Sequence, residues 1–269
     1  MDDRNEPSPC ARLRVVSGFE LSIDGSIVRV PSHVERVLAY LAVNDREQPR
    51  QRVAFQLWTD LPEVRASANL RTALWRGRSA TGRLIVARGG YLSLDPRLDV
   101  DVRHLRALAG RLVHPGSTVD DAEVDLSLMV GDLLPDWDEE WIETERERLR
   151  QLRVHALEAW CRRLTTEGRH AEAVDVGLLA LSAEPLRETA QRLVIEAHLA
   201  EGNPSEAHRC FDLFRTRLWD ELGLEPSSGL TELVGLGGGP GRVPVRVRRR
   251  NGPRRRPVSR SGSSRRSSR

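Results

Sequence analysis

The sequence contains no lysine, so all 42 of its permanently positive side chains are arginine. This usage is typical of a GC-rich coding sequence, and it weakens any argument that rests on a single arginine. Cysteine is almost as scarce. Cys10, Cys161 and Cys210 are far apart and have no CxxC spacing. The sequence therefore argues against a disulfide framework or a zinc knuckle and favours a reducing compartment.

Long apolar runs are also missing. No stretch approaches the roughly 18 apolar residues that a membrane-spanning helix needs, and the polar N-terminus has no apolar core of a signal peptide. Hydrophobic residues make up 39% and charged residues 30% of the chain. We therefore expect a cytoplasmic protein without a membrane partner. The length of 269 residues suffices for one or two domains with proper cores.

Catalytic signatures are absent from the sequence as well. There is no GxxxxGK[ST] loop, and the seven histidines show no metal-ligand spacing with cysteine or carboxylate side chains. The acidic run Asp136–Glu140 is typical of a helix N-terminus, where the helix dipole favours negative charge. The sequence predicts no catalytic residues, no metal and no cofactor, and hence a protein that is not an enzyme.

Charge is distributed unevenly along the chain. Residues 1–102 hold 15 arginines and 13 acidic residues, whereas residues 103–235 hold 15 arginines and 26 acidic residues. Residues 236–269 hold 12 arginines and no acidic residue. The sequence pI of about 9.1 therefore comes from this last segment, and it does not by itself indicate a nucleic-acid partner.

Both ends of the chain have compositions that bury little. We expect residues 1–12 to be a disordered N-terminus and residues 236–269 to be a disordered tail rich in Arg, Ser, Gly and Pro. The tail's arginines could bind phosphate backbones without sequence choice. Alternatively the tail is a coding accident, such as a shifted reading frame.

Residues 13–98 predict a winged helix-turn-helix. Strand-like alternation around an Asp24-Gly25 turn comes first, followed by three helical patterns over 32–44, 50–58 and 63–79. Two short apolar runs around Gly89-Gly90 then predict a hairpin, the wing. We expect capping boxes at the first and third helices, from Ser32 with Glu35 and from Asp60 with Glu63.

The helix expected over 63–79 separates two kinds of side chain. At ~100° per residue, its inward face holds small and apolar residues (Ala66, Leu70, Ala73, Leu74 and Gly77). The candidate DNA-binding residues lie outward: Arg65, Asn69, Thr72, Trp75 and Arg76, with Arg71 and Arg78 at the edge. Arginine can bind guanine or phosphate, and asparagine can pair with adenine. From these residues alone an ordinary surface helix is an equal alternative; the neighbouring helices and wing favour a recognition helix.

Arg88 lies at the tip of the expected wing. There it could reach an adjacent phosphate or the minor groove. A solvated turn residue is the alternative interpretation. We include Arg88 among the candidate DNA contacts.

Residues 99–235 predict a second, helical domain. The segment Gly168–Ala173 recurs as Gly202–Ala207, an offset of 34 residues that is typical of tetratricopeptide helix pairs. The expected pairs cover 149–166 with 170–182 and 187–201 with 204–220, closed by a long helix over 138–166 and a last helix near 227–234. The fold class expected is mainly α with a small antiparallel β part: a winged helix-turn-helix followed by a tetratricopeptide-like domain.

Several motifs together resemble one family. Val15–Gly25 and Ala68–Arg76 are similar to the first strands and the recognition helix of the bacterial antibiotic-regulatory activators called SARP. Gly131–Arg150, Ala183–Glu188 and Asp220–Pro226 resemble motifs of their bacterial transcriptional activation domain. The resemblance covers residues 13–234 in the family's order. It implies a transcriptional activator that binds direct repeats in double-stranded promoter DNA and recruits RNA polymerase, with a possible homodimer.

The chain departs from this family at Gly77, where leucine is expected. We expect the glycine to cost the end of the recognition helix about 1 kcal/mol and some packing. Together with the acidic charge of residues 103–235, this departure leaves an alternative open. In that alternative the chain is a helical-repeat interaction module whose winged helix binds DNA weakly or not at all.

Overall fold

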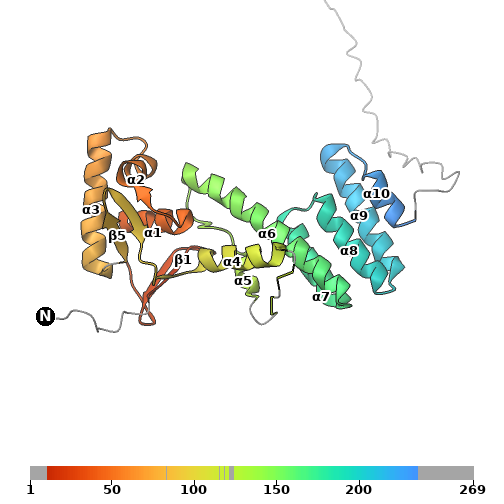
Figure 1. Cartoon of the computed structure of the whole chain (residues 1–269). Coiled ribbons are helices and arrows are strands. Elements are labelled where there is room, and N and C mark those ends of the chain that lie inside the picture. The colour runs from red at the N-terminus through yellow and green to blue at the C-terminus, as the bar shows by residue number, and fades with distance from the viewer. Residues whose placement is uncertain (1–10, 83, 115, 118, 121–123, 236–269) are drawn as a thin grey trace, which may run out of the picture.

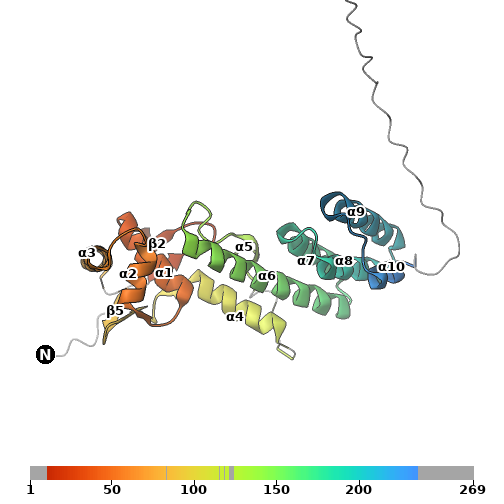
Figure 2. The ribbon, with the colours of Figure 1, turned by 90° about the horizontal axis from the view of Figure 1, so that it is seen from above.

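A computed structural model describes residues 11–82, 84–114, 116–117, 119–120 and 124–235. The expectations for residues 1–10 and for the tail 236–269 lie outside this part of the chain. The disorder expected for residues 11 and 12 is wrong, because Ala11 and Arg12 belong to a strand and pair with Ile23 and Ser22. The described residues form an elongated molecule, with the predicted winged helix at one end and helices α9 (Pro204–Leu222) and α10 (Ser228–Leu233) at the other (Figures 1 and 2). Its class, mainly helical with small sheets, is the one predicted.

The N-terminal sheet has the strand order β3-β2-β1-β7. Its strands are β1 (Ala11–Arg14), β2 (Glu20–Ile23), β3 (Ser26–Ile27) and β7 (Asp99–Val100). Asp24 and Gly25 both have positive φ, 51° and 77°, as a two-residue type I′ hairpin turn requires. The predicted turn is confirmed. Strand β7 pairs parallel to β1 and was not predicted, because two residues carry no readable period.

The three predicted helices are confirmed as α1 (Ser32–Asn44), α2 (Arg50–Leu57) and α3 (Glu63–Thr81). Both predicted capping boxes are wrong. Pro31 and Pro62 occupy the N-cap positions with extended backbone, and neither helix has a side-chain cap. Ser32 and Glu63 are therefore already in the first helical turn, where a side chain no longer has the N-cap geometry that reaches a free backbone N–H.

The wing consists of β5 (Ile85–Arg88) and β6 (Tyr91–Leu94), which pair antiparallel. Gly89 and Gly90 make the turn with φ of 53° and 86°. A third strand, β4 (Gln48–Pro49), pairs with β6 and gives the order β4-β6-β5. In addition, the Arg50 N–H donates to the Gly90 carbonyl at 2.9 Å. The start of α2 is therefore attached to the tip of the wing.

The rest of the described chain is helical. The long helix α6 (Glu140–Thr166) follows α4 (Asp101–Val113) and α5 (Leu126–Val130), and α7 (His170–Ala183) and α8 (Glu188–Ala200) lead to α9. The predicted repeat is visible in the turns. Gly168 and Gly202 have φ of 80° and 82°, and their N–H groups donate to Thr165 and Leu199 at 3.2 and 3.0 Å. The same turn thus recurs 34 residues later.

The loop between α5 and α6 joins the two halves of the molecule. Its backbone pairs with the end of β1: the Leu134 N–H donates to Val15 at 2.9 Å, and Ser17 donates to Asp132 at 2.7 Å. Arg146 of α6 holds the same loop from the other side, donating to the carbonyls of Leu133 (2.8 Å), Leu134 and Trp137 (2.6 Å). The loop is therefore bonded both to the winged domain and to α6.

Arg36 of α1 makes a second connection. Its guanidinium pairs with Glu139, just before α6, at 2.7 Å, and it donates to the carbonyl of Leu57 at the end of α2. Its Cζ lies 5.6 Å from the centre of the Trp58 ring. The indole of Trp141 donates to the same Glu139 at 2.7 Å. One arginine thus links α1, the end of α2 and the start of α6.

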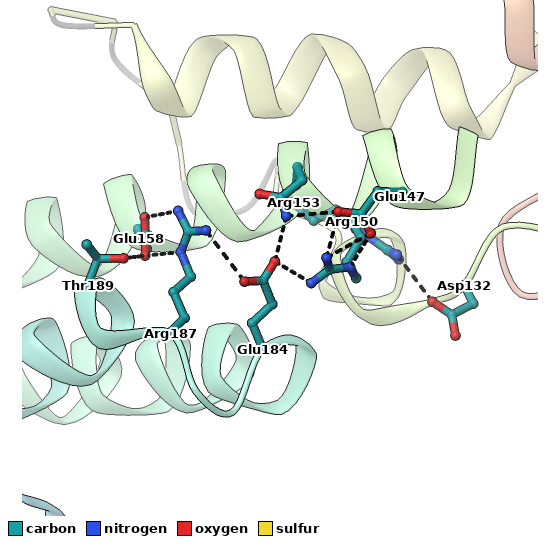
Figure 3. A network of polar contacts seen from close by, with 9 residues as sticks. Asp132, Glu147, Arg150, Arg153, Glu158, Glu184, Arg187 and Thr189 are labelled. Atoms are coloured by element: carbon teal, nitrogen blue, oxygen red, sulfur yellow. Dashed lines mark hydrogen bonds and ion pairs between the residues drawn. The ribbon is translucent and has the colours of Figure 1, made fainter. Parts of the chain in front are cut away.

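A row of ion pairs fixes α6 to the turn between α7 and α8 (Figure 3). Arg150 pairs with Glu147 and Glu184, and Arg187 pairs with Glu158 at 2.7 Å. Burial opposes ionisation of Glu158. Hydrogen bonds from Arg187 and Thr189 outweigh that effect, so the pKa of the Glu158 carboxyl lies below its usual value. The helical domain therefore uses its arginines to hold its own helices.

Candidate nucleic-acid interface

Helix α3 lies at the edge of the molecule with one long side uncovered (Figures 1 and 2). Ala66, Leu70, Ala73 and Gly77 are buried, and Leu74 is half-buried, as the sequence predicted for the inward face. Of the candidate DNA-binding residues, Asn69 is half-buried and the others are exposed: Arg65, Arg71, Thr72, Trp75, Arg76, Arg78 and Arg88. The candidate residues therefore form an accessible surface on α3 and the wing.

The structure divides these candidates between two hollows. Asn69, Thr72 and Arg76 line a recess together with His33 of α1 and Trp58, which we call the α1 recess. The second hollow, the wing cleft, lies between α3 and β5. Its lining includes Trp75, Arg78, Arg88, Arg50 and Arg97. Arg65 and Arg71 line neither hollow.

The arginines of this surface differ from those of the helical domain in their partners. Arg65, Arg71, Arg76, Arg78 and Arg88 make no ion pair with any other described residue. Most arginines of α6 to α9 are paired with glutamate or aspartate, as Arg146, Arg148, Arg150, Arg187 and Arg209 are. Five guanidinium groups without an ion-pair partner among the described residues therefore lie on α3 and the wing.

Two titratable groups beside these hollows have altered pKa values. Burial, together with the positive charge of Arg76, lowers the pKa of His33 below its usual 6.5. Its Nε2 atom is buried and has no hydrogen-bond partner among the described residues. In the wing cleft, hydrogen bonds from Arg97 hold the pKa of the Asp95 carboxyl below its usual value. Burial and the charge of Arg76 thus both favour the neutral form of His33, and Arg76 is the permanent positive charge of the α1 recess.

The structure adds a packing role to the expectation about Gly77. Helix α3 continues to Thr81, so Gly77 lies inside the helix, where it is buried against α1. A Cβ atom at this position would lie 3.2 Å from Cγ1 of Val34, which is fully buried. The glycine permits a close approach of α1 and α3, and a Cβ atom here would require Val34 to move by a few tenths of an ångström. Gly77 is thus part of the packing.

Sequence reasoning missed four contributors to the two hollows: His33, Arg50, Trp58 and Arg97. They come from α1, from either end of α2 and from the loop after β6, and no local sequence pattern places any of them beside α3. The pairing of β4 with β6, which brings Arg50 to the wing, was the missing signal.

Two other features are absent from the part of the chain that the structure describes. Within the described residues, no three His, Cys, Asp or Glu side chains are grouped so as to hold a metal ion. No helix in this part of the chain is long and apolar enough to cross a membrane.

Comparison with known proteins agrees with the architecture. The sequence is 30% identical over 242 residues to the regulatory protein AfsR of Streptomyces coelicolor, covering 85% of this chain and 24% of that protein. It is 27% identical over 231 residues to AfsR of Streptomyces griseus, covering 82% and 23%. The chain thus spans about a quarter of the length of these relatives.

A solved structure shares the fold. Mycobacterium tuberculosis EmbR, in complex with a low-affinity phosphopeptide, superimposes with a TM-score of 0.67 at 22% identity, over 85% of this chain and 65% of that one. The sequence model described as the bacterial transcriptional activator domain matches residues 100–235, about half of the chain. The chain therefore belongs to the bacterial transcriptional activator domain family and is a regulator of the SARP type, as its motifs indicated.

Proposed function

We propose that this regulator binds double-stranded DNA in a sequence-specific manner, with α3 in the major groove and the wing beside it. The observation that carries this proposal is the accessible surface of α3 and β5, on which unpaired arginines gather around the wing cleft. A helix about 10–12 Å across fits the major groove of B-DNA. Unpaired guanidinium groups can exchange water for phosphate or guanine without first breaking an ion pair.

We assign two roles to the candidate residues. Arg65, Asn69, Thr72 and Arg76 are assigned to base edges, and Arg71, Arg78 and Arg88 to phosphates. The Thr72 hydroxyl donates to the Ala68 carbonyl at 3.1 Å, which leaves its oxygen free to accept a hydrogen bond. Asn69, beside Arg76 in the α1 recess, is suited to adenine, and Arg76 to guanine.

The test is a competition binding assay with the full chain. Specific duplexes are first selected from a random pool, and unrelated DNA is the competitor. The double variant Asn69→Ala with Arg76→Ala should lose the preference for selected DNA, because each base contact contributes about 1–3 kcal/mol of discrimination. The control Arg162→Ala lies on α6, far from α3 along the chain, and should bind like the wild type. Undiminished selectivity in the double variant would exclude these residues as readers.

We further propose that the protein is an activator that acts in the cytoplasm at the nucleoid. Two protomers would occupy direct repeats at a promoter, and the helical domain would contact RNA polymerase or a second copy of the chain. Membership of a transcriptional activator family supports the activating direction. Transcription in vitro from a promoter that carries selected sites tests it: added protein should raise the amount of transcript.

The second candidate function is a helical-repeat interaction module with weak DNA binding. Two observations favour it: the excess of acidic residues over 103–235, and an apolar groove between α7 and α9 that is lined by Leu178, Val194 and Leu213. Either half of the molecule could therefore carry the main interaction.

Salt dependence separates the two candidates. If α3 and the wing grip phosphates, the logarithm of the affinity for selected DNA should fall linearly with the logarithm of the salt concentration. Arg78→Ala combined with Arg88→Ala should lower that slope by about two, roughly one for each lost phosphate contact. Filter binding or fluorescence anisotropy between about 50 and 200 mM salt measures this slope. Binding that does not respond to salt, or an unchanged slope, would favour the interaction module.

A further inference from the structure

Trp75 occupies an unusual place on α3. The buried residues Ala66, Ala73 and Gly77 define the inward direction of the helix, and at ~100° per residue Trp75 lies almost opposite them. Trp75 is 71% exposed. No aromatic or cation–π partner for its ring is found among the described residues. A large apolar side chain thus stands at the apex of the proposed recognition helix.

The surroundings of Trp75 set what it can touch. Ala68, two turns earlier on the same side of the helix, is small, so the helix can approach a surface closely while the indole projects beyond it. Trp75 also lines the wing cleft beside Val86 and Ala87 of β5. The candidate base contacts Asn69 and Arg76 lie on the other flank, in the α1 recess. Trp75 therefore lies between the apex of α3 and the wing cleft, apart from the α1 recess.

The floor of the major groove offers one apolar group, the 5-methyl of thymine; the other groups exposed there are hydrogen-bond donors and acceptors. An indole that points to this floor buries its apolar surface best against that methyl group. Contact with polar base edges would desolvate them without replacing their hydrogen bonds. The chemistry of the apex thus differs from that of the arginines and the amide beside it.

We propose that Trp75 contacts the 5-methyl group of a thymine and makes the protein select thymine at one position of each binding site. The inference rests on the proposed function, because it places α3 in the major groove. It adds apolar recognition of one base to the polar contacts already assigned. The competing explanation is that the indole packs on the sugar-phosphate backbone, which carries no sequence information.

The experiment replaces single thymines in a selected duplex by deoxyuridine, which removes only the methyl group and keeps the base pair. Affinities are measured for the full chain and for its Trp75→Ala, Trp75→Phe and Ser79→Ala variants. For the wild type, deoxyuridine at one position should weaken binding about fourfold, the effect expected for one buried methyl group. Trp75→Ala should bind both duplexes equally, and Trp75→Phe should keep part of the difference. Ser79 is exposed on the same helix, and Ser79→Ala should keep all of it.

The outcomes are distinct. If no deoxyuridine position matters while Trp75→Ala weakens every duplex to the same degree, the indole packs on the backbone and the inference is overturned. If the sensitivity to the methyl group persists in Trp75→Ala, another residue reads it, and the inference is overturned as well. Failure of the proposed function would appear earlier, as a wild-type chain that selects no duplex at all.

Discussion

Replacing Asp101 with alanine should lower the free energy of unfolding by about 3 kcal/mol. One oxygen of this buried carboxylate accepts the N–H groups of Val15 and Val16, both at 2.9 Å, and the other accepts the N–H of Val102 at 2.7 Å. Burial raises the pKa of Asp101, and the three N–H groups oppose that rise. Alanine would leave N–H groups buried without an acceptor, at about 1–3 kcal/mol each.

Urea denaturation followed by circular dichroism measures this loss. Asp99→Ala is the matched control two residues earlier, since Asp99 pairs with Arg12 and His104 at a half-exposed position. Such pairs contribute about 0–1 kcal/mol, so the control should change stability little. If the two variants lost equal amounts, the carboxylate of Asp101 would not be the element that fixes the end of β1 to the start of α4.

The second large effect concerns Gly177, at the crossing of α7 and α8. A Cβ atom here would lie 2.5 Å from Cγ2 of Val194 and 3.4 Å from the sulfur of Cys161, and both neighbours are fully buried. Helix propensity alone would make alanine better than glycine by about 1 kcal/mol. Overpacking should outweigh this gain, and Gly177→Ala should lower the free energy of unfolding by about 2 kcal/mol.

Gly110→Ala is the control for propensity without crowding. Gly110 lies inside α4, and a Cβ atom there would meet nothing within 4 Å. This variant should raise the free energy of unfolding by about 0.5–1 kcal/mol. Adding Val194→Ala to Gly177→Ala should restore part of the loss by making room. If Gly177→Ala, made alone, raised the free energy of unfolding as Gly110→Ala does, the packing described for α7 and α8 would be contradicted.

Much of the fold could be predicted from the sequence because long amphipathic helices and glycine turns have strong local signals. The 34-residue offset between Gly168 and Gly202 predicted two equivalent turns, which the structure contains. Strands β4 and β7 were missed, since two-residue strands depend on their partners and not on local preference. The predicted helix caps are wrong because Pro31 and Pro62, which directly precede Ser32 and Glu63, occupy the N-cap positions with extended backbone.

The candidate site was predictable only in part. The helical period separated the inward from the outward side of α3 correctly, because burial of Ala66 and Leu70 follows from one element alone. The grouping of the outward residues into two hollows depends on α1, on α2 and on the wing. The close contact of Gly77 likewise depends on another element, because its neighbour Val34 belongs to α1. The absence of ion pairs at the outward arginines is likewise a property of the folded chain.

The contacts that Arg36 of α1 makes with the end of α2 and with Glu139 bear on the arrangement of two copies of the protein on DNA. Helix α6, 27 residues and about 40 Å long, begins at the residue next to the ion pair of Arg36 with Glu139. Each helical domain is therefore expected to keep a fixed orientation relative to the DNA half-site that its own winged helix binds. On direct repeats the orientation of the second copy would depend on the helical phase between the two half-sites. About half a helical turn of extra spacing would therefore place the two helical domains on opposite faces of the duplex. The protein would then discriminate between half-site spacings through its rigid connection between domains, in addition to its contacts with bases.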